Sequence, residues 1–122
     1  MVLVDTSVWI DHLRKTSQHL QLLLIDGEVV CHPLVIGELV CGNLHNRKEI
    51  IGLLQALPMA PEIDFEEYLY FVEAHHLFGK GIGYIDIQLL ASAKLSQTSL
   101  WTLDKRLNTD AIEFGITYKK SR

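Results

Sequence analysis

The chain has 122 residues, of which 48% are hydrophobic, so it has the size of one ordinary domain and enough apolar side chains for a core. Its formal net charge of -4 excludes a general basic surface, and binding to nucleic acid would need local basic patches or bound cations. Two cysteines without C-x-x-C spacing are too few for a disulfide framework, and no stretch approaches the ~18 uninterrupted apolar residues of a membrane span. We therefore expect a single domain over residues 1–122, in the reducing cytoplasm and without a membrane partner.

The first third of the chain predicts the order strand, helix, helix, strand. Residues 2–4 form a short apolar run, and the apolar residues after them recur at helical spacing, with Thr6 or Ser7 as the helix cap. Ser17 is placed to cap a second helix, which closes at an Asp-Gly pair. Residues 28–31 then predict a second strand that ends at a His-Pro pair.

The rest of the chain continues the alternation of helices and strands. Helices are predicted over residues 34–42, 46–57, 64–78 and 83–93, with a short extended piece at 59–60 and a glycine-rich loop at 79–83. A strand at 99–103 follows, Asp104 begins the last helix, and residues 116–118 are a candidate edge strand. Strands that alternate with helices favour right-handed crossovers, so we predict an α/β fold, an α/β/α sandwich with a mainly parallel central sheet.

Four carboxylates stand where the local sequence is apolar. Asp5 and Asp104 each follow a predicted strand, and Glu38 is the only charge in the helix at 34–42. Asp86 interrupts an apolar stripe on its helix. The stripe is Ile82, Ile85, Leu89, Leu90 and Ala93. A buried carboxylate costs several kcal/mol unless it is paired, hydrogen-bonded or bound to a cation, so we expect these four acids in buried surroundings with compensating partners.

Taken singly, each acid has a structural explanation. Asp5 can begin a turn, Asp104 can cap its helix, and Asp86 lies near a helix N-terminus, where the dipole favours negative charge. Glu38 can belong to a structural ion pair. In α/β folds, however, ligands gather outside the carboxyl ends of the strands, which is where Asp5 and Asp104 are expected.

Taken together, the four acids predict a metal site. Carboxylates gathered in one place repel one another and raise each other's pKa, unless a hard cation draws them together. Ligation by oxygen alone suits Mg²⁺ or Mn²⁺ rather than Zn²⁺. Such a site supports hydrolysis of phosphodiester bonds by metal-activated water, with the cation neutralising the phosphate charge that an acidic chain cannot.

The motifs that carry these acids resemble one family over essentially the whole chain. In chain order they are VLVDTSVWI around Asp5, LVIGELVCGN around Glu38, GIGYIDIQLLASAKL around Asp86 and LWTLDKRL around Asp104. Their order and spacing are similar to those of the PIN-domain nucleases, and most similar to the VapC toxins of bacterial toxin-antitoxin modules. By position, the resemblance implies that the four acids are the catalytic and metal-binding residues.

The resemblance also implies a biological setting and auxiliary residues. VapC proteins are Mg²⁺-dependent endoribonucleases, often acting on tRNA or other structured RNA, usually homodimeric and held inactive by a VapB-type antitoxin. DNA would be contacted only indirectly, through the antitoxin. Thr6 or Ser7 is implied as a hydroxyl that holds a metal-bound water, and Asn108, one helical turn beyond Asp104, as an auxiliary facing the same cleft.

Basic residues near the acids are candidates for holding RNA phosphates, a contact that positions the RNA without reading its sequence. Lys80, Lys105 and Arg106 are preferred because they neighbour the acid-bearing segments. The further candidates are Arg14, Lys15 and the tail at 119–122. Apolar side chains on the helix at 64–78 are a candidate surface for self-association or antitoxin docking. The six histidines are scattered, and we expect them at the surface or in supporting positions rather than as catalytic acid and base.

Two other classes of protein remain open at this stage. A phosphoacceptor domain of the receiver type is also a small α/β protein with a Mg²⁺ site at a strand end, but it needs adjacent acids near its first strand and a lysine after a late strand. This chain has one acid after its first strand, and Glu38 and Asp86 fall in helical segments. A non-catalytic binding module that keeps a nuclease fold for its partner has no need of all four acids.

Overall fold

Three short parallel strands form the centre of the structure, a computed structural model that describes residues 1–120. Strand β1 (Val2–Val4) lies in the middle, with β2 (Val29–Val30) on one side and β3 (Ser99–Trp101) on the other. Both pairings are parallel. All of β1 is buried, which is typical of a parallel strand covered on both faces.

Two isolated bridges widen the sheet at its edges. Cys31 pairs with Met59 beside β2, and Leu100 pairs with Thr117 beside β3. The outer bridge is closed by the amide of Leu100 donating to the Ile116 carbonyl at 2.7 Å. The predicted extended piece at 59–60 and edge strand at 116–118 are therefore confirmed, each at the length of a single bridge.

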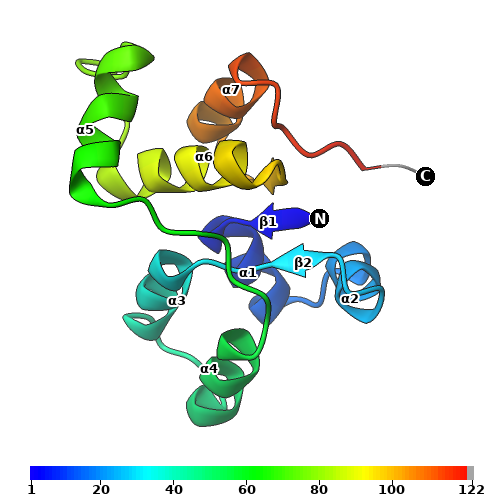
Figure 1. Cartoon of the computed structure of the whole chain (residues 1–122). Helices are drawn as coiled ribbons and strands as arrows, with labels where there is room; N and C mark the ends of the chain where they lie inside the picture. The colour runs from blue at the N-terminus through cyan, green and yellow to red at the C-terminus, as the bar shows by residue number, and fades with distance from the viewer. Residues whose placement is uncertain (121–122) are drawn as a thin grey trace.

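The helices lie on both sides of this sheet. Among residues 1–120 they are α1 (Thr6–Arg14), α2 (Gln18–Ile25), α3 (Pro33–Val40), α4 (Arg47–Gln55), α5 (Phe65–Ala74), α6 (Tyr84–Ser96) and α7 (Lys105–Glu113). Figure 1 shows α5, α6 and α7 on one side of the strands and α1, α3 and α4 on the other. The predicted α/β/α sandwich with a parallel central sheet is confirmed. None of these helices, as far as residue 120, is both long and apolar enough to cross a membrane.

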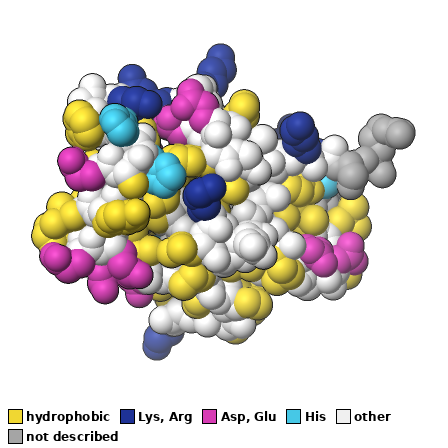
Figure 2. All heavy atoms as spheres, turned by 45° about the horizontal axis from the view of Figure 1, so that its top comes forward, with side chains coloured by type: hydrophobic (Ala, Val, Ile, Leu, Met, Phe, Trp, Pro, Cys, Tyr) yellow, Lys and Arg dark blue, Asp and Glu magenta, His cyan; other side chains and the backbone are white. Residues whose placement is uncertain are grey.

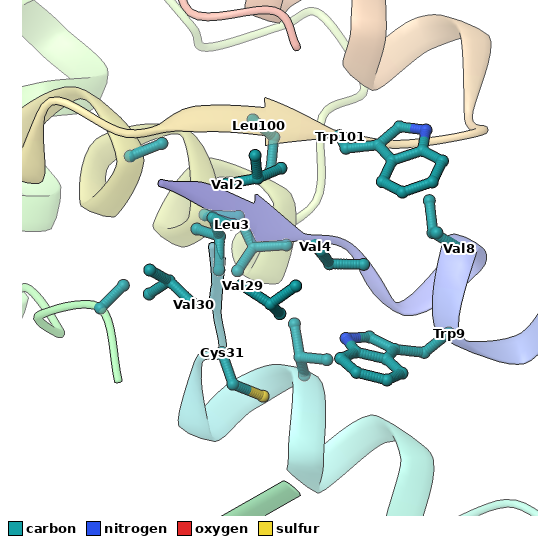
Figure 3. Close-up of a cluster of buried hydrophobic side chains, with 14 of the residues drawn as sticks. Val2, Leu3, Val4, Val8, Trp9, Val29, Val30, Cys31, Leu100 and Trp101 are labelled. Carbon is teal, nitrogen blue, oxygen red and sulfur yellow. The ribbon is translucent and has the colours of Figure 1, made fainter. Parts of the chain in front are cut away.

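The hydrophobic core lies on both faces of the sheet. Figure 3 shows side chains of all three strands packed together, with Val8 and Trp9 of α1 closing the cluster. Helix α6 contacts β3, α5 and α7. Because it is covered from several directions, its residues from Ile87 to Ala93 are all buried, and the single apolar stripe predicted for this helix is only part of its buried surface.

Several element ends differ from the sequence-based expectation: α6 extends to Ser96 rather than residue 93, and α3, α4 and β3 each end two residues earlier than predicted. The cap of α1 is Asp5, whose side chain accepts from the Ser7 amide, so Thr6 and Ser7 are the first helical residues rather than the cap. Helix α5 ends at Ala74, short of the predicted residue 78. The chain leaves the helix because His76 has a φ of 54°, in the left-handed region.

A buried polar chain joins the start of α3 to the middle of α6. His32 is 0% exposed, its Nδ1 accepts from the Leu34 amide at 3.0 Å, and its Nε2 lies 3.0 Å from Ser92 Oγ. The Ser92 hydroxyl donates to the Pro61 carbonyl at 2.5 Å. Since Nδ1 is an acceptor, the ring is neutral with its proton on Nε2, and burial lowers its pKa, partly opposed by the charge of Glu62. The expectation that the histidines take surface or supporting positions is wrong for His32, which is a core residue.

Candidate active site

The carboxyl ends of β1 and β3 bring two of the predicted acids to one edge of the sheet. Asp5 directly follows β1, and its amide donates to the Trp101 carbonyl at the end of β3 at 2.9 Å. Asp104 follows β3 after a short turn and caps α7 by accepting from the Leu107 amide at 3.0 Å. Parallel strands end at the same edge, so the predicted proximity of Asp5 and Asp104 follows from the topology.

Asp5 is held in place by two hydroxyl groups. The side chains of Ser7 and Thr102 each donate to Asp5 Oδ2 at 2.7 Å. Ser7 Oγ in turn accepts from the Leu103 amide at 3.0 Å, so it links the start of α1 to the turn after β3. Asp5 is 6% exposed, and both hydroxyls use the same oxygen, which leaves Oδ1 directed to no donor among residues 1–120. This arrangement compensates the buried charge and orients it.

Thr102 is a site residue that we did not select from the sequence. It is 8% exposed and lies between β3 and Asp104, where its hydroxyl also accepts from the Asp104 amide at 3.0 Å. Its position in the sequence could have indicated this role, because it is a hydroxyl residue that lies between a predicted strand and Asp104. Its partner Asp5 is 97 residues away in the chain, and that pairing appears only in the fold.

Glu38 reaches the site from α3. Its Oε1 accepts from Thr6 Oγ1 at 2.5 Å, which ties it to the residue next to Asp5. Glu38 is exposed, so the prediction of a buried acid is wrong here. The reason is that α3 turns Val35 and Leu39, with the partly buried Ile36, toward the core, while Gly37 and Glu38 lie on its exposed side. Within residues 1–120 Glu38 forms no ion pair, so a structural ion pair does not account for it.

Asp86 lies in the first turn of α6, after the capping residue Gly83. The pKa of Asp86 is raised to about 6, first by burial and then by the negative charges of the other carboxylates around it. Those carboxylates are Asp5, Asp104, Glu38 and Asp110. Among residues 1–120 no hydrogen bond reaches the Asp86 carboxylate. The fold therefore brings the four predicted acids close enough to repel one another, with Asp86 at the centre of that repulsion.

Helix N-termini offset part of this repulsion. Asp5 caps α1, Asp104 caps α7, and Asp86 lies in the first turn of α6. The N-terminus of a helix carries a partial positive charge, which favours a nearby anion by about 0.3–1 kcal/mol at an exposed position. Asp104, like Glu38, is exposed, contrary to the expectation that all four acids are in buried surroundings. Solvent and helix ends together permit a concentration of charge that a closed interior would not.

Asp110 is a further carboxylate that we did not select. It is 8% exposed on α7, and its pKa is raised by burial and by Glu113, while Lys80 and Arg106 act in the opposite direction. Lys80, Arg106 and Asp110 line one surface hollow. The two predicted RNA-contacting cations therefore lie together beside Asp110, and Arg106 also donates from Nη1 to the Gly81 carbonyl at 3.1 Å. The third such cation, Lys105, is exposed at the first residue of α7.

The remaining predicted residues take less direct positions. The amide oxygen of Asn108 accepts from Thr117 Oγ1 at 2.7 Å, so this side chain contacts the C-terminal segment rather than an acid. In the predicted basic tail, Lys120 Nζ lies 5.2 Å from the centre of the Trp101 ring. Ser121 and Arg122 of that tail lie outside the described residues.

The chemistry of the site fits a hard divalent cation. In the arrangement described for residues 1–120, no three Asp, Glu, His or Cys side chains are already placed so that they could hold one metal ion. The groups available are carboxylate oxygens, which suit Mg²⁺ or Mn²⁺. Asp86 has a raised pKa and no hydrogen-bond donor among these residues. Of the four acids, it is therefore the one whose ionised form a bound cation would stabilise most.

Comparison with known proteins gives the family. The family model described as PIN domain matches residues 2–111. Two curated relatives, each named Ribonuclease VapC32, come from the CDC 1551 / Oshkosh and ATCC 25618 / H37Rv strains of Mycobacterium tuberculosis. Each is 44% identical to this chain over 117 residues, which cover 95% of this chain and 94% of the relative. With its acids at the carboxyl edge of a parallel sheet and this degree of similarity, the chain belongs to the PIN domain family and, within it, to the VapC group.

Proposed function

We propose that this protein is an endoribonuclease that depends on Mg²⁺ or Mn²⁺, with Asp5, Glu38, Asp86 and Asp104 as the acids that would hold the cation. The observation that carries the proposal is the raised pKa of Asp86, caused by burial and by the charges of the other three acids and Asp110. Acids that repel one another in this way are explained by a bound cation. The similarity to proteins named ribonuclease points to RNA as the substrate.

The cation, when bound, would activate a water molecule and neutralise charge on the scissile phosphate. The chain's own residues prepare the site for it. The hydroxyls of Ser7 and Thr102 fix the Asp5 carboxylate, and the hydroxyl of Thr6 holds Glu38 toward the same edge. We propose these three hydroxyl residues as positioning groups for the acids, and we give Asn108 no larger part because its amide is bonded to Thr117.

Basic residues beside the acids are proposed to hold the RNA backbone. Lys80 and Arg106 lie on one surface hollow, and Lys105 is exposed next to Asp104. Contacts of this kind position the substrate and weaken as salt concentration rises. The chain has a net charge of -4 and therefore no general basic surface, so these residues would supply the positive charge locally.

We propose the biological role of a toxin in a VapBC-type toxin-antitoxin module, inhibited by a VapB-type antitoxin and acting in the cytoplasm on tRNA or another structured RNA. In this proposal residues 1–122 are one PIN-like domain, and DNA is met only through the antitoxin. Self-association as a homodimer is proposed through α5, where Phe65 and Tyr70 are 64% and 75% exposed. Figure 2 shows hydrophobic side chains among acidic ones on the left, the side on which α5 lies.

Metal-dependent cleavage of RNA tests the activity. Purified protein should cut RNA with Mg²⁺ or Mn²⁺ and stop in excess EDTA, leaving a 5′-phosphate and a 3′-hydroxyl because water attacks the phosphorus and the 3′ oxygen leaves. Asp5→Ala and Asp86→Ala should each lower the rate by about 100-fold or more. Glu49→Gln removes an exposed acid from α4 and should leave the rate unchanged. Undiminished cleavage in EDTA, or products with 2′,3′-cyclic ends, would show that the proposed chemistry is wrong.

A further inference from the structure

The loop between α5 and α6 determines where the helix that carries Asp86 begins. Gly79 and Gly81 have φ values of 72° and 75°, in the region that favours glycine. Gly83 then caps α6 without a side-chain hydrogen bond, and Asp86 follows in the first turn. A loop so rich in glycine has a large conformational freedom, so a specific contact is needed to hold it in one form.

Arg106 supplies such a contact. Its Nη1 donates to the Gly81 carbonyl at 3.1 Å, the one hydrogen bond to residues 79–82 among those described for residues 1–120. A Cβ built on Gly81 would lie 2.8 Å from the same nitrogen. The guanidinium group therefore lies directly against the backbone of Gly81, and a side chain at position 81 would displace it.

The contact joins the elements that carry two of the acids. Arg106 lies in the first turn of α7, two residues after the cap Asp104, while Gly81 lies just before α6 and Asp86. The two residues are 25 positions apart in the chain. A guanidinium group is planar and always charged, and it presents several donors in a fixed geometry, which makes it better suited than an ammonium group to hold a carbonyl in one place.

We propose that Arg106 is a positioning residue, which holds the 79–83 loop against α7 and thereby sets Asp86 relative to Asp104. This role rests on the proposed function of the acids as cation ligands. It differs from the phosphate contact expected for Arg106 from the sequence, because it acts through the protein backbone and operates without RNA.

Replacement of Arg106 tests the proposal in the free protein. In Arg106→Ala, amide hydrogen exchange of residues 82–87 should become faster without any metal present, because the loop and the first turn of α6 lose their tether. Mn²⁺ affinity, measured by the paramagnetic resonance signal of the free ion, should fall by about 10-fold, as for other groups that orient metal ligands. Lys48→Ala removes an exposed cation from α4 and should change neither quantity.

The glycines of the loop provide matched variants. Gly81→Ala combines a strained φ with a clash against Arg106, whereas Gly79→Ala has a strained φ and open space. Gly83→Ala has neither problem, since its φ is -78° and no atom lies within 4 Å. Amide exchange at 82–87 and Mn²⁺ affinity should change most in Gly81→Ala and less in Gly79→Ala, while Gly83→Ala measures the separate cost of alanine at the helix cap. When Arg106 is already replaced by alanine, Gly81→Ala should change amide exchange and Mn²⁺ affinity no more than Gly79→Ala does, because the clash with the arginine is then absent.

Kinetics separate positioning from a phosphate contact. If Arg106 positions Asp86, Arg106→Ala lowers kcat together with Mn²⁺ affinity and amide protection, whether or not a lost phosphate contact also reduces the salt dependence of RNA binding. A higher KM and a smaller salt slope, with unchanged amide exchange and Mn²⁺ affinity, would overturn the proposal and assign Arg106 to the phosphates. A wild-type protein that binds Mn²⁺ but does not cut RNA would refute the proposed nuclease activity alone, since exchange and Mn²⁺ binding still test Arg106.

Discussion

Two groups of polar side chains lie at different points along α6, one at its middle and one in its first turn. They differ in whether their polar atoms have hydrogen-bond partners within the protein. In the middle of the helix, Ser92 lies between His32 and the Pro61 carbonyl, so that neutral donors and acceptors form a closed chain. In the first turn, Asp86 faces other carboxylates, and no donor among residues 1–120 reaches it. The first group is complete within the protein, while the second has an excess of negative charge.

The difference separates a structural polar group from a functional one. In the sequence, both groups are polar residues among apolar ones, so polarity alone did not show which group was structural and which functional. A buried neutral group with matched partners stabilises one arrangement of the core. A cluster of like charges destabilises the fold until something outside the chain neutralises it. The missing hydrogen-bond partner of Asp86, rather than its burial, supports the proposal that these acids bind a cation.

The largest loss of stability should come from breaking the complete group. His32→Ala removes a fully buried ring, leaves the Leu34 amide without its acceptor and removes one of the two partners of the Ser92 hydroxyl, so the free energy of unfolding should fall by about 2–4 kcal/mol. Urea unfolding measures this change. His76→Ala, an exposed histidine, is the control. A loss as small as the control's would mean that the buried chain is not structural.

The second effect is a pH dependence at the acids. The pKa of Asp86 is about 6 in the folded protein against the usual 3.8, so the folded form holds this proton more tightly than the unfolded form. Ionisation of Asp86 therefore lowers the stability of the folded protein. This loss of stability is absent below about pH 4, grows between pH 4 and 6, and is complete above pH 6. Without metal, Asp86→Asn should therefore exceed wild type in stability by about 1–2 kcal/mol at pH 8, after allowance for solvent screening, and by nothing near pH 4.

Urea unfolding of both proteins across this pH range checks the dependence. The difference between wild type and Asp86→Asn isolates the group from His32, which titrates in both proteins. A difference that stays constant with pH would show that neither burial nor the other carboxylates raise the pKa of Asp86.

The smallest effects should come from removing two hydroxyl groups that bind acids, one buried and one exposed to solvent. Thr102→Val removes a buried donor to Asp5, while Thr6→Val removes an exposed donor to Glu38. A hydrogen bond to a charged group is worth about 1.5–3 kcal/mol when buried and less in solvent, so Thr102→Val should slow cleavage about 10-fold or more and Thr6→Val only a few-fold. Steady-state cleavage of one RNA by both variants gives the comparison. An equal loss in both would mean that depth does not matter here.

The sequence predicts those parts of the site that local rules determine. Asp5 and Asp104 follow strands, and parallel strands end at one edge, so their meeting follows from the order of elements. Thr102 was missed because its partner Asp5 is distant in the chain, and Asp110 because its effect on Asp86 depends on the packing of α7 against α6. The apolar sequence around Glu38 indicated burial, but α3 packs against α1 and α4 and leaves Glu38 at the surface. His32 was misjudged because its burial depends on Ser92, 60 residues away.

The most direct test of the central claim, that a cation completes the acid cluster, is the stability of wild type and Asp86→Asn during a Mg²⁺ titration near pH 8. Without Mg²⁺, Asp86→Asn should be the more stable protein. Added Mg²⁺ should stabilise wild type by about 2–3 kcal/mol at 100 times its Kd and reverse the order, whereas KCl at the same ionic strength should not. Parallel curves for the two proteins, or an equal effect of KCl, would contradict the account.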